Sequence, residues 1–174
     1  PITHSVNTLS NTLFLGIRPF ERLGSAVMEL RAGGARERYF GEAVADSFGM
    51  IAGLKDGMRT FIHTMHTEVP LGQVSKLEGS VKVPAIEGTK GKIIRTPLTF
   101  LTATDDFFKT LATRGDLYAQ AYRQAARDGI TMAERPSFIA NLVTNPTEQM
   151  MVHARSEATY RTFQKELGEG GKTL

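Results

Sequence analysis

The stretch that decides the fold is residues 41–57, which read GEAVADSFGMIAGLKDG. A small residue recurs there at every fourth position, and these are Gly41, Ala45, Gly49, Gly53 and Gly57. Positions four apart share one face of an α-helix, and each glycine inside a helix costs about 1 kcal/mol relative to alanine. Repeated glycine on one face therefore predicts a helix-packing seam, where a second backbone approaches closely.

Two interpretations of this seam stay open. It is either a contact between helices of one module, or a surface for oligomerisation or transient membrane contact, as small-residue stripes are in bilayers. Charged residues argue against permanent insertion of this helix into a membrane, and these are Glu42, Asp46, Lys55, Asp56 and Arg59. The contact within the module is the preferred interpretation.

The hydrophobic periodicity on either side of this stretch predicts an all-α chain of five or six helices. One long helix is expected over about residues 35–68, followed by a long irregular loop over about residues 69–95. Helical spacing resumes after Thr96 and Pro97, and the last helix follows Asn145 and Pro146; both pairs are typical of helix N-termini. We expect residues 1–168 to form a single helical module, as a fragment of a much longer protein, and residues 169–174 to form a frayed tail or linker.

Composition excludes several classes of protein. The chain has 174 residues, of which 41% are hydrophobic and 22% charged, which is ordinary for one globular domain. Cysteine is absent, which excludes disulfides, thiolate metal sites and cysteine nucleophiles. His63 and His66 are three residues apart, but a zinc site needs at least a third ligand. We therefore expect no metal and no cofactor.

The net charge of +3 is too small to indicate a nucleic-acid-binding protein by itself. Its distribution is more informative, because a basic segment within residues 82–95 contains the single acid Glu87. Lysine and arginine there predict weak, sequence-independent contact with nucleic acid. The residues concerned are Lys82, Lys90, Lys92 and Arg95.

Carboxylates and cations in the region 105–123 predict structural ion pairs. Asp105 and Asp106 are adjacent, so they point about 100° apart on a helix and cannot form a paired carboxylate site by themselves. Lys109 lies within reach of Asp105 at four residues' spacing, and an inward-facing aspartate needs a partner. Arg114 and Arg123 are the further cations expected to take part in this ion-pair network.

No catalytic motif is visible, so we expect a protein that is not an enzyme. The chain has no glycine-framed serine nucleophile, metal cluster or dinucleotide fingerprint. A lysozyme-like domain that cleaves peptidoglycan is the alternative, because it needs only one glutamate in a cleft with a raised pKa. Glu134 and Glu42 are the candidates for that role, and a passive protein–protein interaction scaffold is a further alternative.

Three segments carry a resemblance to a known group of proteins. They are IRTPLTFLTATDDFFK at residues 94–109 with its continuation LATRGDLYAQA at 111–121, the helix GEA to GMR at 41–59, and FQKELG at 163–168. These segments resemble parts of very large bacteriophage and prophage proteins, the internal virion, DNA-ejection or large polyvalent proteins. The resemblance covers about residues 5–168 and includes no catalytic motif.

The resemblance implies a non-enzymatic module of the virion. Such a module lies in the capsid interior or near the portal, leaves with the genome and helps to assemble a conduit across the bacterial envelope. The implied partners are other copies of the chain, other virion proteins, double-stranded DNA bound non-specifically, and transiently a membrane. Oligomerisation and delivery into the host cell envelope are part of the same expectation.

Overall fold

The computed structural model describes residues 21, 24, 27–28, 40–70 and 88–162. The described part of the chain is all-α, as the sequence predicts, and its elements comprise five helices without a strand. They are α2 (Phe40–Ala52), α3 (Leu54–Thr67), α4 (Gly88–Arg127), α5 (Arg135–Thr144) and α6 (Glu148–Arg161).

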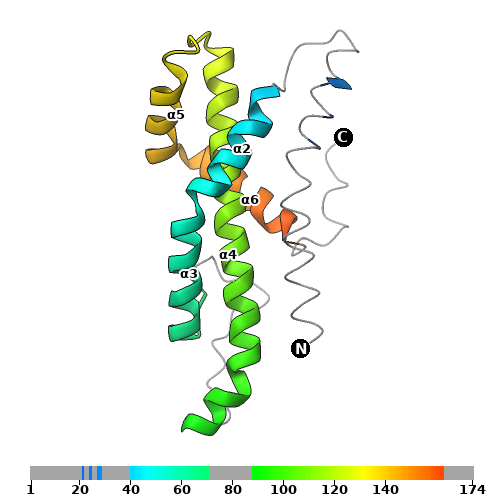
Figure 1. The fold of residues 1–174 in the computed structure, drawn as a ribbon, viewed down its shortest axis with the longest axis vertical. Coiled ribbons are helices and arrows are strands. Elements are labelled where there is room, and N and C mark those ends of the chain that lie inside the picture. Colours follow the sequence, from blue (N-terminus) through cyan, green and yellow to red (C-terminus); the bar gives the residue numbers. More distant parts are fainter. Residues whose placement is uncertain (1–20, 22–23, 25–26, 29–39, 71–87, 163–174) are drawn as a thin grey trace.

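The 40-residue helix α4 is the axis of this structure. At about 1.5 Å per residue it spans roughly 60 Å. The other described helices all pack against it. In Figure 1, α2 and α3 follow one side of α4, α5 lies beside its C-terminal end, and α6 crosses near its middle.

The prediction of a single long helix over residues 35–68 is wrong for the part of that range that the structure describes. Two helices, α2 and α3, meet at Gly53, and the chain changes direction between them (Figure 1). Backbone hydrogen bonds still run from Gly53 N to Gly49 O (2.9 Å) and from Gly57 N to Gly53 O (2.8 Å). Glycine is a common cause of helix bends, and here the bend occurs without loss of helical phase.

The loop expected over residues 69–95 is too long. Residues 88–95 belong to α4, while the part at 71–87 lies outside the described residues. Thr96 is therefore no N-cap, and Pro97 lies inside the helix rather than at its first position. A proline removes one backbone bond but does not always end a helix, and the first turns of α4 tilt away from the rest of its axis (Figure 1).

The last helix also begins later than predicted. Thr147, not Asn145, is the N-cap of α6, and its hydroxyl accepts a hydrogen bond from Met150 N at 3.3 Å. Asn145 instead ends α5. Thr147 is extended, with φ −67° and ψ 157°, so the helix starts only after it.

The core consists of two apolar clusters on α4. One joins Phe108, Leu111 and Ala112 to Ala158 of α6. The other joins α4 to α5 and α6, through Leu117, Ala121, Val143, Met150 and Ala154. Many of the buried positions are alanine, which lets helix backbones approach closely. Asp116 lies on α4 between the two clusters, and the charged residues described next gather around it.

Candidate functional site

The small-residue stripe of α2 and α3 faces α4. A side-chain carbon added at Gly49 would lie 2.7 Å from the carbonyl oxygen of Arg114 and 2.9 Å from the Cα of Gly115. One added at Gly53 would meet the side chain of Arg114 at 3.0 Å, and Ala45 is buried. The glycines thus let two helix backbones lie nearly in contact.

The two ends of the stripe meet aromatic and aliphatic side chains of α4. Gly41 lies against the ring of Tyr122, and a carbon added at Gly57 would meet Leu111 at 2.5 Å and Phe107 at 3.0 Å. The whole stripe, from Gly41 to Gly57, therefore forms a contact inside the chain.

The residues expected in ion pairs each have a charged or polar partner, although several of those partners were not foreseen. Lys109 Nζ lies 2.8 Å from Asp105 Oδ2, as the spacing predicts. Arg114 does not reach the inward-facing Asp106; it binds Asp56 of α3 at 2.8 Å. Asp106 is buried and accepts a hydrogen bond from the Thr64 hydroxyl of α3 at 2.8 Å.

Arg123 binds the carboxylate of Glu42 at the start of α2. Its Nε and Nη2 donate to the two oxygens of Glu42 at 3.0 and 2.8 Å. Glu42 is only 1% exposed, so this two-point bond compensates a carboxylate that has been removed from water.

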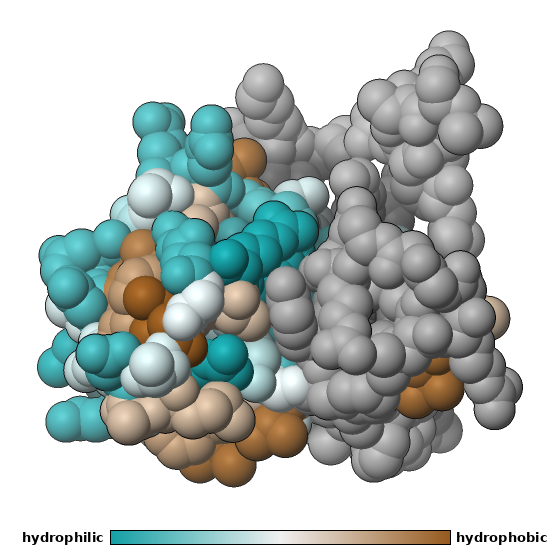
Figure 2. Space-filling view, turned by 90° about the horizontal axis from the view of Figure 1, so that it is seen from above, coloured by the Kyte–Doolittle hydropathy of each residue, from teal (hydrophilic) through white to brown (hydrophobic). Residues whose placement is uncertain are grey.

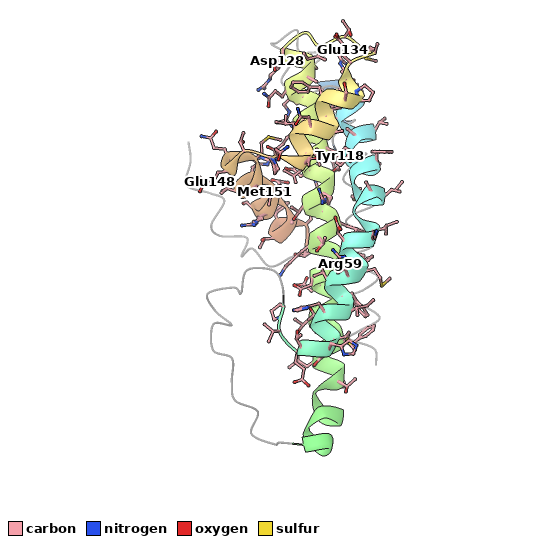
Figure 3. The ribbon with its side chains drawn as sticks, turned by 90° about the vertical axis from the view of Figure 1, so that its left-hand side faces the viewer. Arg59, Tyr118, Asp128, Glu134, Glu148 and Met151 are labelled. Atoms are coloured by element: carbon pink, nitrogen blue, oxygen red, sulfur yellow. The ribbon has the colours of Figure 1, made fainter. Side chains whose placement is uncertain are left out.

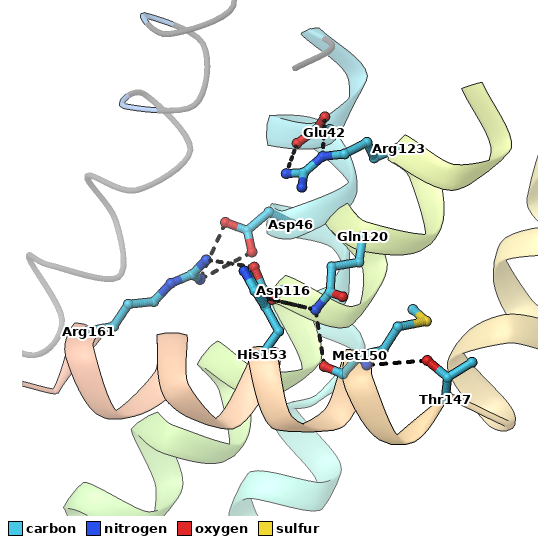
Figure 4. Close-up of polar contacts among 9 residues, drawn as sticks. All are labelled: Glu42, Asp46, Asp116, Gln120, Arg123, Thr147, Met150, His153 and Arg161. Atoms are coloured by element: carbon cyan, nitrogen blue, oxygen red, sulfur yellow. Dashed lines mark hydrogen bonds and ion pairs between the residues drawn. The ribbon is translucent and has the colours of Figure 1, made fainter. Parts of the chain in front are cut away.

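A buried charge cluster, absent from the sequence predictions, lies where α2, α4 and α6 meet (Figure 4). We use this name for Asp46, Asp116 and Arg161. Arg161 Nη1 donates to Asp46 Oδ1 at 3.2 Å, and its Nη2 lies 3.6 Å from Asp116 Oδ1. All three side chains are at most 1% exposed. One guanidinium at the last residue of α6 therefore joins α6 to both other helices.

His153 connects the buried charge cluster to solvent. Its Nδ1 lies 2.9 Å from Asp116 Oδ2, while 53% of its side chain is exposed. Gln120 Nε2 donates to the same Asp116 oxygen at 2.7 Å and to the Met150 carbonyl at 3.2 Å. The hydrogen bond to Asp116 raises the pKa of His153 above 6.5, although desolvation by burial lowers it. The negative charges of Asp116 and Glu157 also raise this pKa.

The contact with Asp116 explains why protonation of this histidine is favourable. A protonated imidazole can donate a hydrogen bond to the buried Asp116 carboxylate and places a positive charge 2.9 Å from it. The arrangement can take up a proton at one accessible point in contact with a buried ion network. Arg161 Nε is buried and lacks a hydrogen-bond partner within the part of the chain that the structure describes.

A pattern in α6 could have revealed the buried charge cluster. Met150, Ala154 and Ala158 occupy the buried face of α6, and the same face continues to position 161. On α2, Asp46 falls on the face that carries Gly49 and Gly53. Charged residues on the small-residue or apolar faces of helices are thus the signal that sequence reasoning missed.

The residues predicted to contact nucleic acid lie partly outside the described chain. Lys90, Lys92 and Arg95 are on the first two turns of α4, at the end of that helix away from the buried charge cluster. Lys82 falls among residues that the structure does not describe.

The two glutamates named for a lysozyme-like role are in different surroundings. Glu42 is fully buried and bound by Arg123. Glu134 is exposed at the connection between α4 and α5 (Figure 3), where it accepts a hydrogen bond from the Thr131 hydroxyl at 2.7 Å. Neither carboxylate is placed in a cleft by these contacts.

Large apolar side chains are exposed along α2 and α3, and one of them, Phe48, also packs edge-on against Tyr118 of α4 with ring centroids 5.6 Å apart. Exposed fractions there range from 48% for Leu54 to 70% for Val44. Figure 2 shows one face of the molecule, where apolar groups reach the surface of the described part among polar ones. The exposed apolar residues of the two helices are Val44, Phe48, Ile51, Leu54, Met58 and Ile62.

Within the described ranges, histidine and carboxylate side chains do not gather in groups of three or more that could hold a metal ion. None of the helices over those residues has an apolar stretch long enough to cross a bilayer. Comparison of the chain with protein-family models, curated proteins and solved structures finds no match.

Proposed function

We propose that this chain is a non-enzymatic structural module of a bacteriophage virion protein that takes part in genome ejection and in assembling a conduit across the host envelope. The observation that carries the proposal is the apolar outer side of α2 and α3, exposed on a bundle whose inner side is tied together by buried ions. Such a bundle suits a rigid building block that is completed by a neighbour. The resemblance to internal virion proteins supplies the biological setting.

The use of the buried polar groups supports a scaffold. Asp46, Asp116 and Arg161 join three helices, and Glu42 is bound by Arg123. These groups hold the bundle together and leave the half-exposed imidazole of His153 as the point where the buried charge cluster meets water. Since Glu42 and Glu134 are held as described above, the lysozyme-like alternative has no observation in its favour.

Contact with DNA in this proposal falls to the basic residues around the start of α4. Lys90, Lys92 and Arg95 lie within eight residues at one end of a helix of roughly 60 Å. Cations at the end of a rigid rod can follow a phosphate backbone without reading its sequence. The module would act in the virion and, during infection, in the bacterial envelope.

Binding to short duplex DNA tests this part of the proposal. We expect affinity to fall steeply between about 50 and 200 mM salt, because each phosphate contact contributes about 0.9 to the log–log slope. Replacing Lys82, Lys90, Lys92 and Arg95 by glutamine should lower that slope and weaken binding. A smaller variant changes only Lys90 and Lys92 to glutamine. Its matched control changes two exposed cations elsewhere in the chain, Arg127 and Arg155, to glutamine.

Equal affinity before and after the change at the four basic residues would remove the DNA contact from the proposal. A chain that ignores DNA at all salt concentrations would favour the passive scaffold, and release of soluble fragments from peptidoglycan by such a chain would favour the lysozyme-like domain.

A further inference from the structure

The outward side chains of α2 and α3 follow a seven-residue repeat. Starting at Val44, the steps are alternately four and three residues, and the positions are Val44, Phe48, Ile51, Lys55, Met58, Ile62 and Met65. This spacing is that of the a and d positions of a coiled coil, sustained over three repeats. We infer that this row, which we call the heptad row, docks in antiparallel orientation on the heptad row of a second copy of the chain.

The structure keeps the heptad row on one face. Five of its apolar members are between 51% and 70% exposed, Lys55 is exposed, and Met65 is half-buried. The backbone bonds across Gly53 preserve the helical phase between α2 and α3. The opposite face, which carries the glycines, is the one that contacts α4. Over the described residues, α2 and α3 pack on α4 and on each other. Phe48 of the row also packs edge-on against Tyr118 of α4, yet 59% of its surface is exposed to a partner.

The charges on this face select the orientation of a second copy. Lys55 occupies a core position of the repeat, and Arg59 lies beside the row. The carboxylates of α2 and α3 are turned elsewhere: Glu42 and Asp46 are buried, and Asp56 binds Arg114. A parallel partner in register would place Lys55 against Lys55 in one layer, where two cations repel each other.

An antiparallel partner avoids this repulsion. With the two-fold axis at Gly53, Phe48 lies opposite Met58 of the second copy, Val44 opposite Ile62, and Lys55 opposite Ile51. The two Lys55 residues are then offset by four residues, or about 6 Å along the axis, and their long side chains can extend to water. The pairing buries every apolar member from Val44 to Ile62 against another apolar side chain or a lysine stem.

This inference deepens the proposed function by naming the surface through which copies associate. Its first test is the mass of the full chain, measured by sedimentation over a range of concentrations. We expect two chains at high concentration and dissociation on dilution. Changing Ile51 and Met58 together to glutamate should weaken association at least about 100-fold, because carboxylates would enter the apolar contact.

The matched control is Val152→Glu, which changes an apolar side chain of similar exposure, 62%, on α6. Both variants should keep the circular dichroism of the parent, since the altered side chains are exposed. A parent chain that stays single at every concentration overturns the inference. DNA binding is measured separately with the basic-residue variant, so a single chain that still binds DNA would leave the proposed function standing.

Orientation is tested by cross-linking, which the absence of cysteine makes simple. Ala52→Cys places a thiol one residue from the two-fold axis, beside the heptad row, so it should form a disulfide between copies on mild oxidation. Ser156→Cys, exposed on α6, is the control and should not cross-link at the same rate. If the Ala52→Cys variant forms dimers that mild oxidation does not cross-link, the antiparallel orientation is overturned.

Two further outcomes complete the test. Lys55→Leu should tighten association at least about tenfold, because an apolar side chain replaces the one charge in the row; weaker association would contradict the register. If the parent stays single but binds phosphatidylglycerol-containing vesicles, and Ile51→Glu abolishes that binding, the row docks on lipid and the inference is wrong.

Discussion

Arg161 shows how one residue can join three helices. The residue is 0% exposed, and its guanidinium contacts Asp46 of α2 and Asp116 of α4 from the last position of α6. Removing one partner from a buried ion network leaves the remaining charges less compensated, and the loss of a buried partner typically costs about 3–5 kcal/mol. We therefore expect Arg161→Met to lower the free energy of unfolding by about 4 kcal/mol.

Urea denaturation measures this change, and Arg155→Met is the matched control because Arg155 is exposed on the same helix. The control should change stability by less than about 0.5 kcal/mol. Similar midpoints for the two variants would show that the buried charge cluster does not stabilise the fold.

His153 predicts how stability depends on pH. Its pKa is raised above the ordinary 6.5 by the bond to Asp116, so the folded chain binds this proton more tightly than the unfolded chain. The resulting stabilisation is fully present below pH 6.5 and is lost as the pH rises through the raised pKa of the folded state. Because the imidazole is half-exposed, we expect a contribution of at most about 1 kcal/mol.

Unfolding curves of the parent chain and of His153→Gln test this on both sides of pH 6.5. The two curves should differ most in acid and converge in alkali. His63→Gln, on α3 and away from the cluster, is the control. A difference that grows with rising pH would contradict the assignment.

The sequence predicts local pairs at this scale and misses distant ones. Asp105 and Lys109 are four residues apart on one helix, so helix geometry alone brings them together. Arg114 and Arg123 were named as ion-pairing residues, but their partners Asp56 and Glu42 depend on how α2 and α3 lie against α4. Arg161 pairs with a residue 115 positions away, and no local rule reaches that far.

At the scale of elements, the fit between α2 and α4 depends on glycine. A carbon added at Gly49 would lie 2.7 Å from a backbone oxygen of α4, whereas one at Gly53 would lie 3.0 Å from the side chain of Arg114 and 3.3 Å from the carbonyl oxygen of Gly49. We expect Gly49→Ala to destabilise the chain by about 2 kcal/mol through overpacking. Gly53→Ala should be close to neutral, because a gain of about 1 kcal/mol in helix propensity offsets the mild contact.

Thermal unfolding of the two single variants makes the comparison, with Gly53→Ala as the internal control. Equal shifts of the midpoint would mean that the backbone contact at Gly49 is relieved by a small movement of α2, and the close approach would then add little to stability.

Helices were easier to predict than their boundaries. Periodic apolar positions reveal that residues 40–67 and 98–127 are helical, because such patterns need only one buried face. The residue at which a helix begins or ends depends on smaller differences in free energy. Pro97 was expected at the first position of a helix, but it lies inside α4. Gly53 was expected inside one unbroken helix, but α2 and α3 meet there.

The whole molecule is organised around α4, and this arrangement predicts how it opens. The centre of α4 carries a nearly continuous series of buried residues, including Phe108, Ala112, Leu117 and Ala121. By contrast, α5 buries one residue, Val143, in the cluster that it shares with α4 and α6. Regions with few buried apolar contacts open at lower free energy than the core. Amides of α5 should therefore exchange with solvent by local opening, and those of central α4 only by global unfolding.

Hydrogen exchange of the native chain, followed by mass spectrometry, measures this difference. Val143→Ala should speed exchange in α5 selectively, because it removes about 2 kcal/mol of apolar contact from that helix. Arg161→Met should instead speed exchange in α2, α6 and central α4 together, since one guanidinium joins all three. If α5 exchanges as slowly as central α4, the described helices open as one cooperative unit, and α5 must gain stability from contacts beyond Val143. If Arg161→Met speeds exchange in α6 alone, the buried charge cluster stabilises the attachment of that helix without coupling α2 to α4.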